Sequence, residues 1–183
     1  GNNHEGSFAL AEEMIGLAAE SGADAVKFQT IIPEKLVSAS QTQRIEQLKK
    51  FQLSHLEFEK LKKVATEENV LFLSTPFDLE SVDFLTPLVP AFKIASGDNN
   101  FFPMIDVIAN TGKPIILSSG LTDLNEIKKT KIFIQNVWNK KGINQELSIL
   151  HCVVNYPTQP NEANLLAIRA LKNLDVVVGY SDH

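Results

Sequence analysis

The feature that most constrains the fold of this chain is a regular alternation between short apolar runs and helical segments. Six apolar runs have the length and the flanking turn residues of buried strands, at residues 23–29, 70–77, 91–96, 114–119, 147–153 and 176–182. Helices are expected around them at residues 8–21, 43–50, 55–68, 78–85, 103–110, 123–140 and 162–173. Strands that alternate with helices form right-handed crossovers, so we predict the α/β class with a parallel sheet.

Two architectures fit this alternation, an open doubly wound sheet and a closed (β/α)8 barrel. A barrel normally needs eight units and about 250 residues, whereas this chain has 183. No Gly-x-Gly-x-x-Gly element follows a strand, and polar residues stand at nearly every strand end. The chain begins in loop-forming residues and stops at a strand end. We therefore predict one partial TIM (β/α)8 barrel domain over residues 1–183, lacking the first strand and the last βα unit.

Composition excludes several classes of partner. The formal charge of −5 comes without a basic stripe, which argues against nucleic acid. No apolar run is long enough to cross a bilayer, and no signal peptide is recognisable at the start, so we expect no membrane association. The single cysteine, Cys152, forbids an internal disulfide and fits a reducing, cytoplasmic compartment. Its apolar surroundings predict a packed core thiol rather than a nucleophile.

Two lysines interrupt apolar strands, and they are the first indication of a binding site. Lys27 lies in Ala-Val-Lys-Phe, and Lys93 lies in Phe-Lys-Ile-Ala. Burying an unpaired ammonium is strongly unfavourable, so each lysine should face a solvated cavity or an anion. The alternative for either lysine is a side chain that snorkels to the rim of the sheet.

Hydroxyl side chains accompany the lysines at the carboxyl ends of the strands, where ligands bind in parallel α/β folds. They are Thr75, Ser96, Ser118 and Ser181. Each alone is explained by turn formation. Together with two lysines they predict a site for a phosphate or carboxylate ligand.

Two further side chains, Glu5 and His183, are candidates for the same carboxyl ends of the strands. Glu5 offers a carboxylate that could bind a polyol or handle a proton. His183 ends a strand, where a neutral imidazole is a candidate metal ligand. His151 lies within a strand and could pair with His183, but we expect it to be a hydrogen-bonded core histidine.

The chain resembles the sialic acid synthase family over essentially its whole length. The resemblance is carried by Asn3-His4-Glu5-Gly6, Gly22-Ala23-Asp24-Ala25-Val26-Lys27-Phe28-Gln29, Leu73-Ser74-Thr75-Pro76-Phe77, Phe92-Lys93-Ile94-Ala95-Ser96-Gly97-Asp98, Gly112-Lys113-Pro114-Ile115-Ile116-Leu117-Ser118-Ser119-Gly120, Leu150-His151-Cys152, Tyr156-Pro157-Thr158 and Gly179-Tyr180-Ser181-Asp182-His183. No single motif is decisive, but their common order makes coincidence implausible.

The resemblance implies a TIM barrel that condenses phosphoenolpyruvate with an N-acylated hexose such as N-acetylmannosamine. The product is a nine-carbon 2-keto sugar acid, and phosphate leaves by C–O cleavage. It also implies a requirement for Mn²⁺ or Mg²⁺ and a homodimer when full length. In the family, a C-terminal antifreeze-like domain from the partner subunit covers the sugar, and this chain lacks that domain.

The resemblance assigns roles position by position. Lys27 and Lys93 are implied to be catalytic together with Glu5. Phosphoenolpyruvate is implied to contact the lysines and the four hydroxyls. The positions near the sugar or the reacting carbons are Glu5, Gln29, Phe77, Asp98 and Tyr156. His183 matches one of two metal-binding histidines, and the other lies in a strand beyond this chain, so the metal site here is expected to be incomplete.

Other interpretations remain open from the sequence. A strand lysine could instead form a Schiff base in an aldolase. The chain could also be a catalytically inactive barrel fragment that acts as a structural or binding module. The acceptor sugar is undecided, and precursors of legionaminate or pseudaminate are alternatives. Val153-Val154 stands where relatives of the family usually have a polar side chain that faces phosphoenolpyruvate. Asp98 is the shorter of the two acids that the family uses, a choice expected to tune which sugar fits.

Overall fold

A computed structural model describes residues 2–183 of the chain. Gly1, which begins the loop expected at the N-terminus, lies outside the described residues. The chain divides into two compact units, one ending at Pro90 and the other running from Ala91 to His183. Among the described residues, no helix is long and apolar enough to cross a membrane.

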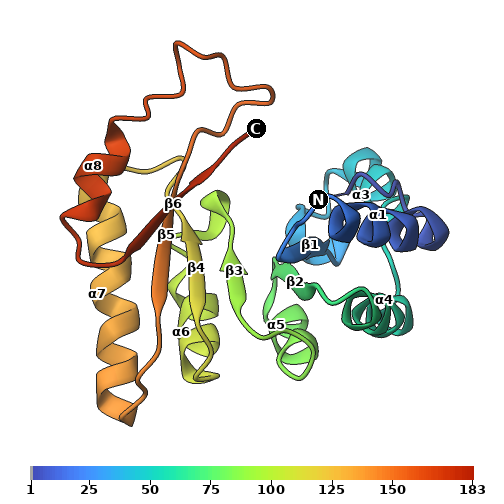
Figure 1. Cartoon of the computed structure of the whole chain (residues 1–183), viewed down its shortest axis with the longest axis horizontal. Helices are drawn as coiled ribbons and strands as arrows, with labels where there is room; N and C mark the ends of the chain where they lie inside the picture. Colours follow the sequence, from blue (N-terminus) through green and yellow to red (C-terminus); the bar gives the residue numbers. More distant parts are fainter. Residues whose placement is uncertain (1) are drawn as a thin grey trace. The chain divides into compact units, whose positions relative to one another are not determined.

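Over its described residues, the first unit carries two strands and five helices. Its elements are α1 (Phe8–Glu20), β1 (Ala25–Thr30), α2 (Pro33–Leu36), α3 (Thr42–Lys49), α4 (His55–Glu67), β2 (Leu71–Pro76) and α5 (Leu79–Leu85) (Figure 1). Strands β1 and β2 pair in parallel, with Lys27 opposite Leu73 and Gln29 opposite Thr75. A helical crossover between two parallel strands is the arrangement that the sequence predicts.

Side-chain caps fix the helix starts that position β1 and β2. The hydroxyl of Ser7 accepts a hydrogen bond from the backbone N–H of Leu10 at 3.3 Å, at the start of α1. At the start of α4, Ser54 and Glu57 form a reciprocal capping box. Both caps satisfy backbone donors that a helix end otherwise leaves without partners.

Aromatic packing shows which face of the first sheet is covered by helices. Phe28 of β1 stacks on Phe72 of β2 with ring centroids 5.5 Å apart, and Phe58 of α4 meets both rings edge-on. Because side chains alternate along a strand, the neighbours of Phe28 in β1 point to the opposite face. Lys27 and Gln29 therefore lie on the face away from α4.

The second unit holds a four-stranded sheet. Its elements are β3 (Phe92–Ile94), the 3₁₀ turn η1 (Ser96–Asp98), α6 (Phe102–Asn110), β4 (Ile115–Ser118), α7 (Leu124–Lys141), β5 (Leu147–Cys152), α8 (Ala167–Lys172) and β6 (Val177–Ser181). All pairs are parallel, in the spatial order β3-β4-β5-β6 (Figure 1). The strand order follows the chain order, as successive right-handed crossovers require.

The two faces of this sheet differ in character. Ile94, Leu117 and Ile149 are register partners on one face, and all three are fully buried. His151 lies on the same face, two residues after Ile149. Its Nε2 is 2.8 Å from the carbonyl oxygen of Ala163, so the expected core histidine is confirmed. By alternation, Lys93 and Ser118 lie on the other face.

The sequence predicted the elements of this fold better than it predicted their assembly. The α/β class with parallel sheets is confirmed, but the described strands form two sheets, and closure into a barrel stays a prediction. The helix expected at 162–173 is shorter, because Asn164 has a φ of +44°, which is incompatible with a right-handed helix. The short α2 was not expected, although Pro33 at its first turn is a usual start signal.

Candidate functional site

In the first unit, two predicted site residues, Lys27 and Thr75, lie beside each other. Lys27 donates a hydrogen bond from Nζ to Oγ1 of Thr75 across the β1–β2 pair at 3.4 Å. Thr75 is buried, and desolvation by burial lowers the pKa of Lys27 below the ordinary lysine value. A partly buried cation beside a hydroxyl is suited to binding an anionic oxygen.

The second unit holds the other pair. Lys93 is buried in β3, and its Nζ donates to the carbonyl of Ile94 at 3.1 Å and to the hydroxyl of Ser118 in β4. A buried ammonium beside a strand hydroxyl is suited to binding an anionic oxygen, as in the first unit.

Ser96 and Asp98 flank this pair in η1, immediately after β3. The hydroxyl of Ser96 accepts a hydrogen bond from the backbone N–H of Gly120 at 3.1 Å, which ties η1 to the end of β4. Asp98 is half-buried, and desolvation raises the pKa of its carboxyl group. The predicted residues Lys93, Ser96 and Ser118 are thus held together by hydrogen bonds.

Three side chains gather around one imidazole nitrogen at the carboxyl ends of β5 and β6. Nε2 of His183 lies 3.3 Å from the hydroxyl of Tyr156, 3.4 Å from Oγ of Ser181 and 3.6 Å from Sγ of Cys152. The rings of Tyr156 and His183 are 4.2 Å apart. Cys152 is buried and free, as expected of a core thiol, but its contact with His183 was not anticipated.

These side chains only partly fit the predicted metal. His183 is exposed and offers one imidazole nitrogen surrounded by oxygen and sulfur atoms, a donor set that suits a divalent cation. Within residues 2–183, however, no three His, Cys, Asp or Glu side chains cluster closely enough to hold a metal ion. His183 can therefore contribute one ligand, and a complete shell needs donors from elsewhere.

Glu5 is presented by a tight turn before α1. Its φ is +50° and that of Gly6 is +81°, so two successive residues adopt the left-handed conformation. A Cβ on Gly6 would lie only 2.0 Å from the carbonyl oxygen of Lys50, so only glycine fits there. Buried His4 braces the turn by accepting a hydrogen bond from the N–H of Gly6 at its Nδ1, at 3.1 Å. The carboxylate of Glu5 is exposed.

The remaining predicted residues lie beside these pairs. Gln29 is half-buried, opposite Thr75 in register and on the same face as Lys27. Phe77 is half-buried just beyond β2. The structure thus brings Lys27 and Thr75 together in one unit, and Lys93, Ser96 and Ser118 in the other. That these two groups face one ligand remains a prediction.

Asn99 was not predicted as a site residue from the sequence. Its side chain is buried, only 4% exposed, next to the Lys93–Ser118 pair. Its Nδ2 donates to the carbonyls of Ser118 at 3.3 Å and Gly120 at 2.8 Å. The only signal in the sequence is an amide immediately after Ser-Gly-Asp, which is equally typical of an ordinary turn.

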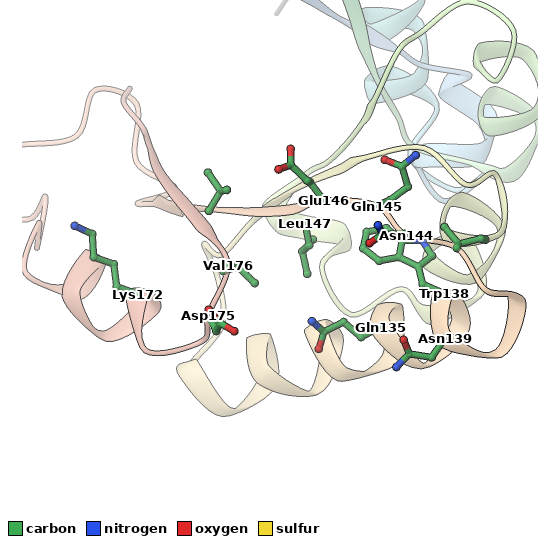
Figure 2. A pocket seen from close by; sticks show the side chains of 12 residues that line it. Gln135, Trp138, Asn139, Asn144, Gln145, Glu146, Leu147, Lys172, Asp175 and Val176 are labelled. Carbon is green, nitrogen blue, oxygen red and sulfur yellow. The ribbon is translucent and has the colours of Figure 1, made fainter.

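A cavity of about 690 Å³ opens at the other end of the second sheet (Figure 2). It is lined by Leu147 and Val177, the first residues of β5 and β6, and by amide side chains such as Gln135, Asn139 and Asn144. None of the predicted site residues lines it. The predicted site residues lie instead toward the carboxyl ends of the strands, where parallel α/β proteins bind ligands.

Comparison with known proteins gives one consistent family. The profile of the NeuB family matches residues 14–183. An uncharacterized protein of Methanocaldococcus jannaschii is 42% identical over the whole of this chain, which covers 53% of that relative. The N,N'-diacetyllegionaminic acid synthase of Campylobacter jejuni is 39% identical, again over the whole chain and 58% of the relative. The chain thus spans somewhat more than half the length of these relatives.

A solved structure gives the same result. The N-acetylneuraminic acid (sialic acid) synthetase of Leptospira borgpetersenii, solved in complex with citrate, superposes with a TM-score of 0.92 and 33% identity. The match covers all of this chain and 62% of the other.

Proposed function

The chain belongs to the NeuB family, and on that premise we propose that the protein of which it forms part is a nonulosonate synthase. It condenses phosphoenolpyruvate with an N-acylated hexose to a nine-carbon 2-keto sugar acid and inorganic phosphate. Relatives with synthase names and a superposable sialic acid synthetase support the reaction class. The observation that carries the proposal is the pair Lys93–Ser118, a buried ammonium that donates to a strand hydroxyl at the carboxyl end of a parallel sheet.

The fold supports this proposal. Parallel strands joined by helices, which both units contain, are what a TIM barrel is built from. In such a barrel Lys27 and Lys93 would both reach the central mouth. The two ammonium groups would then neutralise the carboxylate and the phosphate of phosphoenolpyruvate, so that two polar reactants share one pocket.

In the proposed reaction a C–C bond and a C–O bond to water form, the C–O bond to phosphate breaks, and the aldehyde oxygen takes up one proton to become a hydroxyl. C3 of phosphoenolpyruvate attacks the aldehyde carbon of the sugar, and positive charge develops at C2. Water adds at C2, the bond between C2 and the phosphate oxygen breaks, and the 2-keto group remains. Glu5 stabilises the charge at C2 or accepts the proton released from water. Thr75, Ser96, Ser118 and Ser181 donate hydrogen bonds to the anionic oxygens of phosphoenolpyruvate.

The sugar is assigned to the residues at the outer part of the same mouth. Gln29, Phe77, Asp98 and Tyr156 are proposed to contact it. The relatives differ in their named products, since one is a legionaminic acid synthase and another a sialic acid synthetase. We therefore assign the class of acceptor, an N-acylated hexose, and leave the choice among N-acetylmannosamine and related precursors to experiment.

A divalent cation, Mn²⁺ or Mg²⁺, is proposed to act with these residues. When bound, it would polarise the aldehyde oxygen of the sugar as a Lewis acid. His183 would supply one nitrogen ligand, with Tyr156 and Ser181 beside it. We further propose that the protein is cytoplasmic and dimeric, with a C-terminal antifreeze-like domain of the partner subunit covering the sugar.

A Schiff-base aldolase is the second candidate, because burial lowers the pKa of Lys27 and so favours the neutral, nucleophilic amine. The two functions differ in one covalent intermediate. Borohydride added with a 2-keto acid substrate would trap an adduct on an aldolase lysine. We expect mass spectrometry of the treated protein to show no added mass.

The direct test of the proposed function uses the full-length protein, phosphoenolpyruvate, Mn²⁺ and a panel of N-acylated hexoses. We expect phosphate release that depends on one sugar and on the metal. Release without any sugar would indicate a phosphatase instead, and no release with any of the sugars would support the inactive-module alternative.

A further inference from the structure

Asn99 occupies a central position in the second unit without belonging to any predicted site. It ends η1, and its side chain is buried behind the end of β4. Its backbone carbonyl accepts a hydrogen bond from Oγ1 of Thr130 in α7 at 2.8 Å. Asn99 is therefore anchored to α7 through its backbone, which leaves its side-chain amide to act on β4.

The side-chain amide of Asn99 holds the turn that follows β4. Its two hydrogens are used on two carbonyls of that turn, Ser118 at 3.3 Å and Gly120 at 2.8 Å. The residue between them, Ser119, is held from the other side, because its N–H and its hydroxyl both donate to the carbonyl of Leu150 in β5. The turn is thus clamped between η1 and β5.

The clamped turn carries the groups proposed to bind the anion. The hydroxyl of Ser118 accepts the hydrogen bond from Lys93, and the N–H of Gly120 donates to Ser96. The contact is close, since a Cβ on Gly120 would lie 2.7 Å from Oγ of Ser96. A shift of the turn would therefore move Ser118 away from Lys93 and release Ser96 at the same time.

The chemistry of the position requires a primary amide. Only a side-chain NH₂ offers two donors in one plane at this length, and both are used on backbone carbonyls. The carboxylate of aspartate has the same shape but would place its acceptor oxygens against the carbonyl oxygens of Ser118 and Gly120. Alanine would leave both carbonyls without this donor.

We propose that Asn99 is a positioning residue for the anion site, an inference that rests on the proposed function. It acts through the turn 118–120, and it sets the distances among Lys93, Ser96 and Ser118 without touching phosphoenolpyruvate itself.

The test compares Asn99→Ala and Asn99→Asp with wild type in the full-length protein, by calorimetric titration with phosphoenolpyruvate and by thermal unfolding. Thr130→Val is the matched control, since it removes a buried hydrogen bond to the backbone of Asn99 but leaves both hydrogen bonds from its side-chain amide. We expect Asn99→Ala to weaken phosphoenolpyruvate binding at least 10-fold and Asn99→Asp to weaken it further. Thr130→Val should lower the unfolding temperature and keep the affinity within about 2-fold.

A pH series keeps the test informative if Asn99→Ala folds poorly. Protonation of the introduced carboxylate in the Asn99→Asp variant restores one O–H donor toward the turn. The ratio of dissociation constants, variant over wild type at each pH, should therefore fall as the pH is lowered from about 8 to about 5. A ratio that stays constant with pH, or an unchanged affinity in Asn99→Ala, would overturn this inference and leave the proposed function standing. Wild-type protein that fails to bind phosphoenolpyruvate overturns the proposed function and this inference with it.

Discussion

The ammonium of Lys93 in β3 donates a hydrogen bond to the hydroxyl of Ser118 in β4, and both side chains are buried. Their other neighbours explain why the contact persists. The carbonyl of Ile94 accepts a second hydrogen bond from Lys93, and Asn99 fixes the turn that begins at Ser118. A buried ammonium beside a strand hydroxyl can bind an anionic oxygen, and anion binding is the role that we propose for this pair.

The first prediction concerns Lys93→Met, which keeps the length of the side chain and removes its charge. We expect it to weaken phosphoenolpyruvate binding by about 2–5 kcal/mol, the usual cost of truncating one partner of a buried charge pair. Calorimetric titration with phosphoenolpyruvate measures the loss, and denaturant unfolding shows that the variant is folded under the same conditions.

The control for this variant is Lys140→Met, at an exposed position in the last turn of α7. Loss of an exposed lysine should leave phosphoenolpyruvate affinity within about 2-fold. Equal losses in the two variants would mean that general electrostatic attraction, and not a specific site, explains binding.

The second prediction follows from the lowered pKa of Lys27, which desolvation causes. In the proposed function the protonated amine binds the anion, so phosphoenolpyruvate affinity should fall as the pH rises through the pKa of Lys27 in the folded protein. This fall should begin below the ordinary pKa of lysine, about 10.4. In Lys27→Arg, whose guanidinium keeps its proton, the affinity should stay level over the same range.

The free energy of unfolding should rise with pH over the range in which phosphoenolpyruvate affinity falls. Between the lowered pKa of the folded state and the ordinary pKa of the unfolded chain, the unfolded state binds more protons at Lys27 than the folded state does. The free energy of unfolding therefore rises with pH through this window. Measured against Lys27→Met, wild type should gain stability there, and a loss of stability would contradict the assigned cause of the shift.

The third prediction concerns the close approach at Gly120. A Cβ there would lie 2.6 Å from Cγ2 of Val154 and 2.7 Å from Oγ of Ser96. Gly120→Ala should lower the free energy of unfolding by about 1–3 kcal/mol, as overpacking does. Adding Val154→Ala should recover part of that loss, because one of the two obstacles is removed.

Gly97→Ala is the matched control, since Gly97 has an ordinary φ and a Cβ added to it would meet no atom within 4 Å. Its effect on the free energy of unfolding should stay within about 0.5 kcal/mol. If Gly120→Ala proves equally harmless, the turn packs less tightly against Ser96 and Val154 than these distances indicate.

Much of the local structure was predictable from the sequence, for identifiable physical reasons. The hydroxyl of Ser7 and the Ser54–Glu57 pair cap helices where the spacing of these residues places them. Lys27 and Lys93 stood out because each interrupts an apolar strand, and both do lie beside a strand hydroxyl.

The missed features depend on contacts between residues far apart in the chain. Asn99 acts on a turn about twenty residues later, and Cys152 meets His183 across two strands. Neither contact leaves a periodic pattern in the sequence. The shortening of α8 follows from the positive φ of Asn164. Asparagine tolerates this conformation but also occurs in helices, so the residue type alone does not predict it.

The measurement that tests the proposed reaction most directly is the fate of the bridging oxygen of phosphoenolpyruvate. The full-length protein is incubated with phosphoenolpyruvate labelled with ¹⁸O between C2 and phosphorus, together with Mn²⁺ and the accepted N-acylated hexose. Cleavage of the C–O bond predicts that all of the label leaves with inorganic phosphate. Label retained in the nine-carbon keto acid, which requires P–O cleavage, would contradict the proposed mechanism.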